Sequence, residues 1–227
     1  MNIRIVALRI LDQILGLVGV GVAVFWSAGR MDWWPAWAAI AVLLAWFVVE
    51  DVVVLRLDPG LIAERLKPPR GAKAWDRAIV SIARLTQLAR YILSGLDQRY
   101  GWTGGVPLAA QVSGLIVCNL GQALFTWAMA SNTFFSQILR IQSDRGHVAV
   151  TGGPYRYVRH PGYVGAMMFE FGVSALLASW WSLIAAGFFA VLFILRTALE
   201  DRTLQAGLPG YVDYARQVRY RLLPGIW

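Results

Sequence analysis

The stretch GHVAVTGGPYRYVRHPGY, residues 146–163, separates two apolar runs and gathers histidine, arginine and tyrosine side chains in one short connector. Its Gly-Gly-Pro triplet at 152–154 is typical of a turn, because glycine admits positive φ and proline fixes φ near the turn value. His160 precedes a proline and is biased away from the helical region, whereas Pro161 suits the first position of a helix. The pattern predicts a helix that begins at Pro161 and runs into the apolar segment 163–181.

A helix that begins at Pro161 presents unpaired N–H groups and the positive end of its dipole to this connector. His147, Tyr155 and His160 lie on the same connector. Such a helix end readily binds a carboxylate or a phosphate. The connector is therefore the first candidate for a binding site, although an isolated His-Pro pair more often only begins a helix.

The composition excludes an ordinary soluble domain. Of the 227 residues, 58% are hydrophobic and 15% are charged. Apolar runs close to the ~20 residues that cross a bilayer occur at 5–26, 33–55, 106–130 and 188–199 with its upstream flank. The sequence predicts an all-α, polytopic membrane protein.

The segment 77–96 decides the number of spans. Arg84 and Arg90 interrupt its apolar pattern, so alone it could lie flat on the membrane surface. If it spans, all the basic segments fall on one side of the membrane, as the positive-inside rule favours. These segments are the N-terminus, the 56–77 loop, the 131–162 connector and the C-terminal tail. We therefore predict about six transmembrane helices with both termini cytoplasmic and a pocket at the cytoplasmic end. The last two helices would form a hairpin joined near 178–182, and the tail 207–227 an interfacial helix that covers the pocket.

The net charge of +8 is spread over short loops, so we attribute it to membrane topology and expect no nucleic-acid partner. Cys118, which lies in an apolar run, is the single cysteine of the chain, so an intrachain disulfide is excluded. We also expect no metal, and we interpret the first apolar run as a retained span.

Several separated motifs follow one another in the C-terminal part of the chain: His147 to Val150, Gly153-Pro154-Tyr155, Arg159 to Gly165, Arg196 to Asp201, Gly210 to Tyr214, Arg219 and Leu222 to Pro224. Together these motifs resemble the membrane methyltransferase family that includes isoprenylcysteine carboxyl methyltransferase and the phospholipid methyltransferases. They cover roughly the C-terminal two fifths of the chain, and their combination is more specific than any one motif. The family usually has two successive glutamates where this chain has Glu200-Asp201, a departure that keeps the charge.

The resemblance implies S-adenosyl-L-methionine as methyl donor and a lipophilic small molecule or membrane lipid as acceptor. It assigns substrate contact to Arg196. It assigns cofactor contact to Gln142, His147, Val148, Ala149, Val150, Tyr155, His160, Pro161, Gly162, Tyr163 and Glu200. We divide the chain into N-terminal transmembrane helices with a basic loop, 1–105, and a methyltransferase-like core, 106–227.

Four polar residues in or near the helices have two interpretations each. Glu170 lies about two turns inside the predicted hairpin, where a carboxylate is costly, so it is either catalytic or a packing partner of Asn132 or a buried arginine. Arg196 and Glu200 share one helical face, either as an ion pair or as residues that point at the connector. Asn132 either caps a helix end or reaches the pocket. We predict Arg196 and Glu170 as catalytic candidates and Arg196 and Asn132 as substrate contacts.

The acceptor stays open among a lipid amine, a lipophilic carboxylate and a small thiol. The compact six-span form with a short N-terminus is typical of a prokaryotic member in the inner membrane, which disfavours an isoprenylcysteine acceptor. Two other functions remain: an NADPH-dependent membrane reductase of the sterol reductase type, and a non-catalytic membrane scaffold or transporter.

Overall fold

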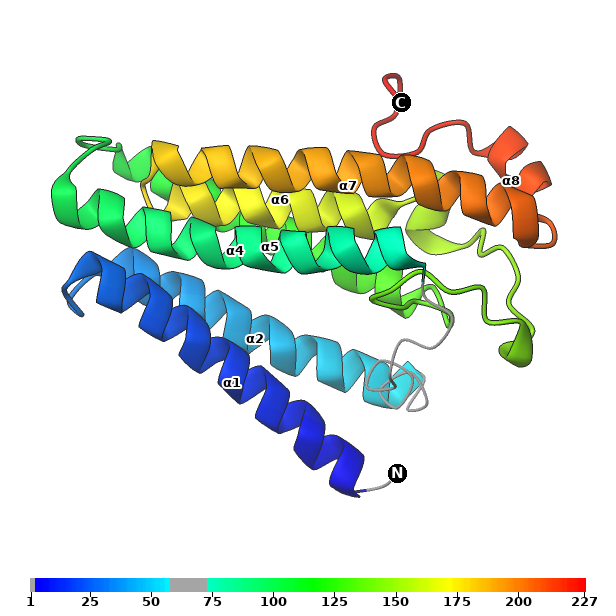
Figure 1. Cartoon of the computed structure of the whole chain (residues 1–227), viewed down its shortest axis with the longest axis horizontal. Helices are drawn as coiled ribbons and strands as arrows, with labels where there is room; N and C mark the ends of the chain where they lie inside the picture. Colours follow the sequence, from blue (N-terminus) through cyan, green and yellow to red (C-terminus); the bar gives the residue numbers. More distant parts are fainter. Residues whose placement is uncertain (1–2, 58–72) are drawn as a thin grey trace.

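The computed structural model describes residues 3–57 and 73–227, and all regular elements in these ranges are helices. The long helices are α1 (Ile3–Ala28), α2 (Trp34–Leu57), α4 (Ala74–Tyr100), α5 (Leu108–Ala130), α6 (Pro161–Leu176) and α7 (Trp180–Gly207). They run side by side as one bundle (Figure 1). Two short 3-10 turns, Ser143–Arg145 and Gly153–Arg156, punctuate the α5–α6 connector, and α8 (Tyr211–Gln217) follows α7. The predicted all-α class is confirmed.

Helices α1, α2, α5 and α7 are long and apolar enough to cross a membrane within the described ranges, and the chain is an integral membrane protein. Helices α4 and α6 belong to the same bundle without meeting that standard. Helix α4 carries several charged residues, and the 16 residues of α6 extend about 24 Å against a hydrocarbon core of ~30 Å. The predicted count of six is reached if these two helices cross with their polar groups paired inside the bundle.

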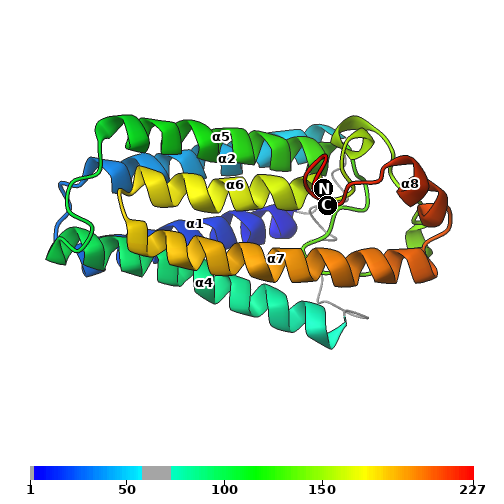
Figure 2. The ribbon, with the colours of Figure 1, turned by 90° about the horizontal axis from the view of Figure 1, so that it is seen from above.

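The connections divide between the two ends of the bundle. The start of α1, the connector 131–160 and α8 lie toward one end, and the α1–α2, α4–α5 and α6–α7 turns lie at the other (Figures 1 and 2). This is the arrangement that the six-span topology predicts for these segments. Of the predicted basic loop 56–77, residues 58–72 lie outside the described residues.

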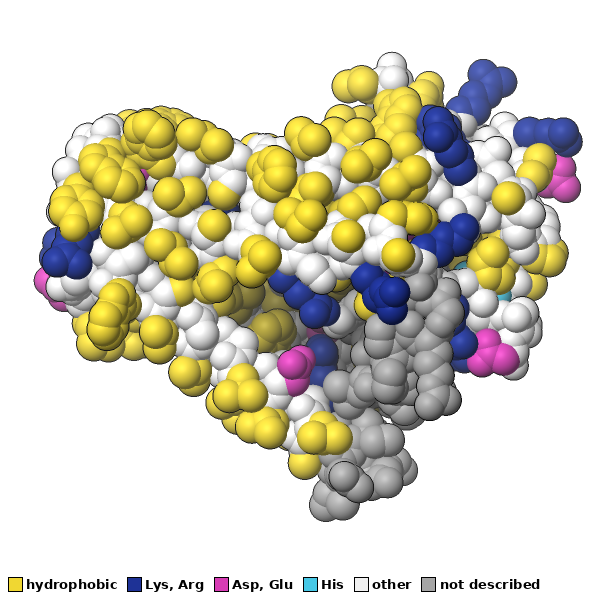
Figure 3. Space-filling view, viewed as in Figure 1, with side chains coloured by type: hydrophobic (Ala, Val, Ile, Leu, Met, Phe, Trp, Pro, Cys, Tyr) yellow, Lys and Arg dark blue, Asp and Glu magenta, His cyan; other side chains and the backbone are white. Residues whose placement is uncertain are grey.

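The outer surface of the helices is apolar. Leu85, Ile184 and Val191 have 61% or more of their surface exposed. In Figure 3 hydrophobic side chains cover the length of the bundle, whereas most Lys and Arg side chains gather toward the end that carries α8. Exposed apolar surface of this extent is typical of helices that face lipid.

Helices α5 and α6 pack with their backbones in contact. A Cβ atom on Gly121 would lie 2.6 Å from the carbonyl oxygen of Gly165, and one on Gly172 would overlap the backbone of Cys118. Small residues permit such an approach of two membrane helices. This contact fixes where α6 begins relative to α5, and therefore where the connector between them is held.

The turn of the C-terminal hairpin comes earlier than predicted. Helix α6 ends at Leu176 and α7 begins at Trp180, so the turn lies at 177–179 and overlaps only the first part of the predicted boundary near 178–182. Ser179 explains the difference, because its side chain accepts the N–H of Ser182 at 3.1 Å and caps α7. Helix α7 then continues beyond Glu200 to Gly207.

Candidate functional site

A cavity of about 110 Å³ lies where the α5–α6 connector, the first turn of α6, the C-terminal half of α7 and α8 meet. The predicted site residues that line it are Asn132, His147, Val148, Ala149, Val150, Tyr155, His160, Gly162, Tyr163, Arg196 and Glu200. Tyr211 and Tyr214 of α8 complete the lining, so the predicted cover by the tail is present. The start of α6 at Pro161 agrees with the sequence prediction, and His160 before it is non-helical, with φ −128°.

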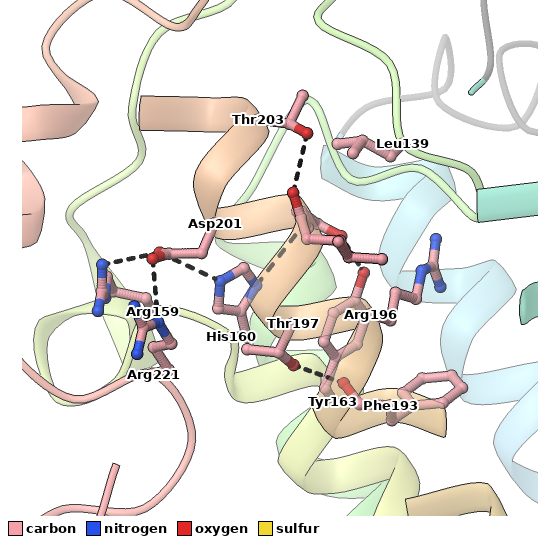
Figure 4. A network of polar contacts seen from close by, with 12 residues as sticks. Leu139, Arg159, His160, Tyr163, Phe193, Arg196, Thr197, Asp201, Thr203 and Arg221 are labelled. Carbon is pink, nitrogen blue, oxygen red and sulfur yellow. Dashed lines mark hydrogen bonds and ion pairs between the residues drawn. The ribbon is translucent and has the colours of Figure 1, made fainter. Parts of the chain in front are cut away.

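Glu200 is held by two aromatic side chains from the start of α6. The hydroxyl of Tyr163 donates a hydrogen bond to Oε2 of Glu200, and Nδ1 of His160 lies 3.8 Å from Oε1. The rings of His160 and Tyr163 stack, with centroids 5.5 Å apart. Figure 4 shows both side chains from close by. The carboxylate of Glu200 thus has a fixed position at the cavity.

Asp201, the next residue, faces away from the cavity and anchors its surroundings. Arg159 donates to Oδ1 at 2.7 Å, Tyr211 donates to the same oxygen at 2.9 Å, and Arg221 donates to Oδ2 at 3.0 Å. Nε2 of His160 lies 3.8 Å from Oδ1. In Figure 4 Asp201 has Arg159 and Arg221 on one side and His160 on the other. A single fully buried carboxylate therefore joins the connector, α7 and the tail.

The tail also binds the backbone of the connector. The N–H groups of Arg159 and His160 donate to the carbonyl oxygens of Tyr220 and Arg221, each at 2.9 Å. The hydroxyl of Tyr214 donates to the carbonyl oxygen of Tyr155 at 2.8 Å. Because these bonds involve residues of the cavity wall, the tail restrains the part of the connector that lines the cavity.

Four aromatic residues that line the cavity, His147, Tyr155, Tyr211 and Tyr214, are uncharged. Burial lowers the pKa of His147, and the charge of Arg145 lowers it further. Nδ1 of His147 accepts the N–H of Gln142 at 3.2 Å, which requires that this nitrogen carry no proton. Burial raises the pKa of Tyr155, Tyr211 and Tyr214, so these phenols keep their protons. Asn132 lines the cavity, where its side chain accepts the N–H of Phe134 and donates to Tyr155, whereas Ser131 is the residue that caps the end of α5.

Arg196 lies in the cavity wall with a partner that the sequence did not indicate. Nε of Arg196 donates to Oδ1 of Asp76 at 2.8 Å, and Nη2 donates to the carbonyl oxygen of Gln137 at 2.8 Å. Asp76 comes from the first turn of α4, 120 residues earlier in the chain. Arg196 thus pairs with Asp76 rather than with Glu200, the i,i+4 partner that the sequence spacing offers. An acid in the first turn of a helix is common and points to no particular function, so no sequence signal marked Asp76.

Three predicted site residues lie outside the cavity lining. Gln142 is a buried residue of the connector itself, where its side chain donates to the carbonyl oxygen of Phe134 and accepts from the guanidinium of Arg145. Pro161 begins α6 without facing the cavity. Glu170 pairs with Arg90 at 2.8 Å, and both side chains are 1% exposed. The structure therefore gives Glu170 the packing role with a buried arginine, because a carboxylate inside the bundle requires a compensating charge.

Part of the chain is similar to known proteins. The model of the isoprenylcysteine carboxyl methyltransferase family matches residues 114–206, from α5 into α7. Protein-S-isoprenylcysteine O-methyltransferase of Schizosaccharomyces pombe is 40% identical over 70 residues, 30% of each chain. Protein-S-isoprenylcysteine O-methyltransferase B of Arabidopsis thaliana is 32% identical over 111 residues, 46% of this chain and 55% of the relative. A probable protein-S-isoprenylcysteine O-methyltransferase of Oryza sativa subsp. indica is 26% identical over 142 residues, 60% of this chain and 71% of the relative.

The match to the Schizosaccharomyces pombe relative spans 30% of its length, and that to the Tribolium castaneum relative 38%. The family match contains the connector, all of α6 and both Arg196 and Glu200. It leaves α1, α2, α4 and α8 outside. Through residues 114–206, the chain is similar to the isoprenylcysteine carboxyl methyltransferase family.

Proposed function

We propose that this protein is an S-adenosyl-L-methionine-dependent methyltransferase of the membrane, which binds the donor in the cavity beside Glu200 and methylates a lipophilic carboxylic acid. The observation that carries the proposal is the charge of the cavity. Glu200 is the one acid among its described lining residues, whereas the lining arginines each have an aspartate partner. These partners are Asp201 for Arg159, Asp76 for Arg196 and Asp144 for Arg140.

This charge pattern complements the donor. With its three arginines compensated and His147 neutral, the cavity is left with the negative charge of Glu200. S-adenosyl-L-methionine carries a sulfonium, an ammonium and a carboxylate, and so one net positive charge. Opposite net charges favour association in a poorly hydrated site.

The residues present also fit the separate groups of the donor. Glu200 accepts the ammonium group in a charge-assisted hydrogen bond. Gly162 lines the cavity and carries the first N–H of α6, because Pro161 has none, and this helix end suits the carboxylate. Tyr155, Tyr211 and Tyr214 offer aromatic faces to the adenine and the sulfonium.

The cavity is smaller than the roughly 300 Å³ that a site for a ligand of this size occupies. We therefore expect the connector and α8 to separate when the donor binds. The bonds from Asp201 to Tyr211 and Arg221 limit how far they separate. Closure afterwards would exclude water from the reacting atoms.

The donor supplies an electrophilic methyl group, and the chain supplies position and surroundings. Arg196 orients the acceptor carboxylate by a charge-assisted hydrogen bond. An ionised carboxylate has no proton to lose before it is methylated, so the reaction requires no general base. The absence of Glu170 from the cavity lining is consistent with a reaction that needs no general base. Positioning of the two reactants then provides most of the acceleration.

We choose a carboxylic acid over an amine or a thiol because the relatives are named protein-S-isoprenylcysteine O-methyltransferases, and this name indicates methylation of an oxygen. The apolar helices around the site suit an acceptor that arrives from the bilayer. The basic residues near α8 suit a cytoplasmic location of this end, by the positive-inside rule. A prokaryotic inner membrane stays our expectation for the location.

A transfer assay tests the function. Purified protein in nanodiscs is incubated with donor labelled in the methyl group and with N-acetyl-S-farnesylcysteine or a membrane extract, and the labelled product is identified by mass. We expect a base-labile methyl ester. Saturable binding of NADPH without binding of S-adenosylhomocysteine would instead support the reductase, and no binding of either would support the scaffold.

A further inference from the structure

Asp76 lies outside the family match, yet it supports the cavity wall from behind. It is 0% exposed and belongs to the first turn of α4. Its Oδ1 accepts from Nε of Arg196 at 2.8 Å, and its Oδ2 accepts the backbone N–H of Leu139 at 2.6 Å. Leu139 is itself a lining residue of the cavity. Three segments that are distant in sequence, α4, the connector and α7, therefore meet at one carboxylate.

The contacts of Arg196 restrain its guanidinium on several sides. Nη2 donates to the carbonyl oxygen of Gln137 at 2.8 Å and lies 3.3 Å from Oδ2 of Asp76. The guanidinium carbon lies 5.1 Å from the ring centroid of Tyr163, the residue that bonds Glu200. Nη1 takes part in none of these hydrogen bonds. Because Arg196 lines the cavity, this nitrogen is the one left to a ligand.

We propose that Asp76 is a positioning residue that fixes Arg196 to receive the carboxylate of the acceptor. The proposal rests on the proposed function and names the group that makes Arg196 selective. A free arginine side chain has many rotamers, and ordering it on binding costs free energy that the pair with Asp76 removes in advance. Asp76 also compensates the charge of Arg196, which leaves Glu200 to set the charge that the donor meets.

The pair predicts a preference that can be measured without turnover. A held guanidinium forms a charge-assisted bond with a carboxylate and a weaker one with a neutral amide. We therefore compare the affinity of the protein for N-acetyl-S-farnesylcysteine with its affinity for the matching carboxamide, in nanodiscs saturated with S-adenosylhomocysteine. The wild type should prefer the acid by on the order of tenfold.

The substitution Asp76→Asn should abolish most of this preference while it leaves the affinity for S-adenosylhomocysteine within about twofold of wild type. Arg196→Lys should have a similar effect, and the double variant should be no worse than Arg196→Lys, because the two residues act as one unit. Asp76→Glu should restore part of the preference. Asp32→Asn is the matched control, since it removes an exposed Arg–Asp pair with Arg30 at the other end of the bundle.

The results distinguish a failure of the positioning role of Asp76 from a failure of the proposed methyltransferase function. Unaltered discrimination in Asp76→Asn, or additive effects in the double variant, would overturn the positioning role. A wild type that binds S-adenosylhomocysteine but does not prefer the acid would overturn it as well, with donor binding intact. A wild type that binds no S-adenosylhomocysteine would refute the proposed function, on which the role of Asp76 depends.

Discussion

Glu170 and Glu200 lie on the two arms of one helical hairpin, and the structure gives them opposite surroundings. Glu170 accepts from Arg90 at 2.8 Å and from Gln87 at 2.9 Å, both from α4, deep among the helices. Glu200 is 16% exposed, lines the cavity, accepts a hydrogen bond from Tyr163 and lies 3.8 Å from His160, and it forms no ion pair with an arginine among the described residues. A carboxylate inside a membrane helix is therefore no sufficient sign of catalysis. What separates structure from function is whether an arginine neutralises it or a cavity reaches it.

The largest expected effect is on the stability of the bundle. Glu170→Ala leaves Arg90 buried without its partner, which should cost about 3–5 kcal/mol of unfolding free energy. Denaturant titration in mixed micelles measures this loss. The double variant Glu170→Ala, Arg90→Met removes both charges and should recover much of it. Equal stability of the single variant and wild type would contradict the structural role of Glu170.

A second effect on stability tests the contact between α5 and α6. Gly172→Ala places a methyl group against the backbone of Cys118 and should destabilise the protein by about 1–3 kcal/mol. Gly187→Ala is the matched control on α7, where a Cβ atom meets nothing within 4 Å. The same denaturant titration should separate the two variants. If they behave alike, α5 and α6 are not in the close contact that the structure shows.

At the cavity end, substitutions should affect binding more than stability. His160→Ala removes the imidazole between Glu200 and Asp201 and should weaken S-adenosylhomocysteine binding by about 1–3 kcal/mol. Tyr157→Ala is the control, because Tyr157 belongs to the same connector and is 65% exposed. Isothermal titration calorimetry in nanodiscs measures both. Full affinity in His160→Ala would remove the imidazole from the binding site.

The smallest effect concerns pH. The pKa of His147 is lower in the folded protein than in the unfolded chain, so the unfolded chain binds more protons as the pH falls below about 6.5. The contribution of His147 to stability is therefore complete above that pH and is lost as the pH falls toward its folded-state pKa. His147→Asn, which retains an acceptor for the N–H of Gln142, should lose less melting temperature than wild type between pH 7.5 and pH 5.5. Parallel losses would show that this imidazole is not buried in its neutral form.

The features of the site that depend on neighbouring residues can be predicted from the sequence. The Gly-Gly-Pro turn, the start of α6 at Pro161 and the gathering of histidines and tyrosines on one connector depend on neighbouring residues, whose conformational preferences are known. The site role of Glu200 came instead from the resemblance to the family. The resemblance to the family added the donor, which no side-chain pattern in the chain would have identified.

The long-range pairs could not be predicted. Asp76 pairs with Arg196, and Arg90 with Glu170, only when α4 packs against α6 and α7. The distance and the orientation between these helices are not encoded in a local sequence pattern. Asp201 gathers Arg159, Tyr211 and Arg221 from three segments for the same reason. The predicted turn near 178–182 was too late because a single serine, Ser179, fixes the start of α7. Hydrophobic periodicity is insensitive to such a cap.

The most direct test of the account compares the two glutamates in one titration with S-adenosylhomocysteine. Glu200→Gln and Glu170→Gln make the same chemical change on the two arms of the hairpin, and both variants are measured in nanodiscs beside wild type. The account predicts that Glu200→Gln weakens binding by on the order of tenfold or more, while Glu170→Gln binds like wild type once its folded fraction is counted. Equal affinity of wild type and Glu200→Gln would contradict the assignment of the donor to this cavity.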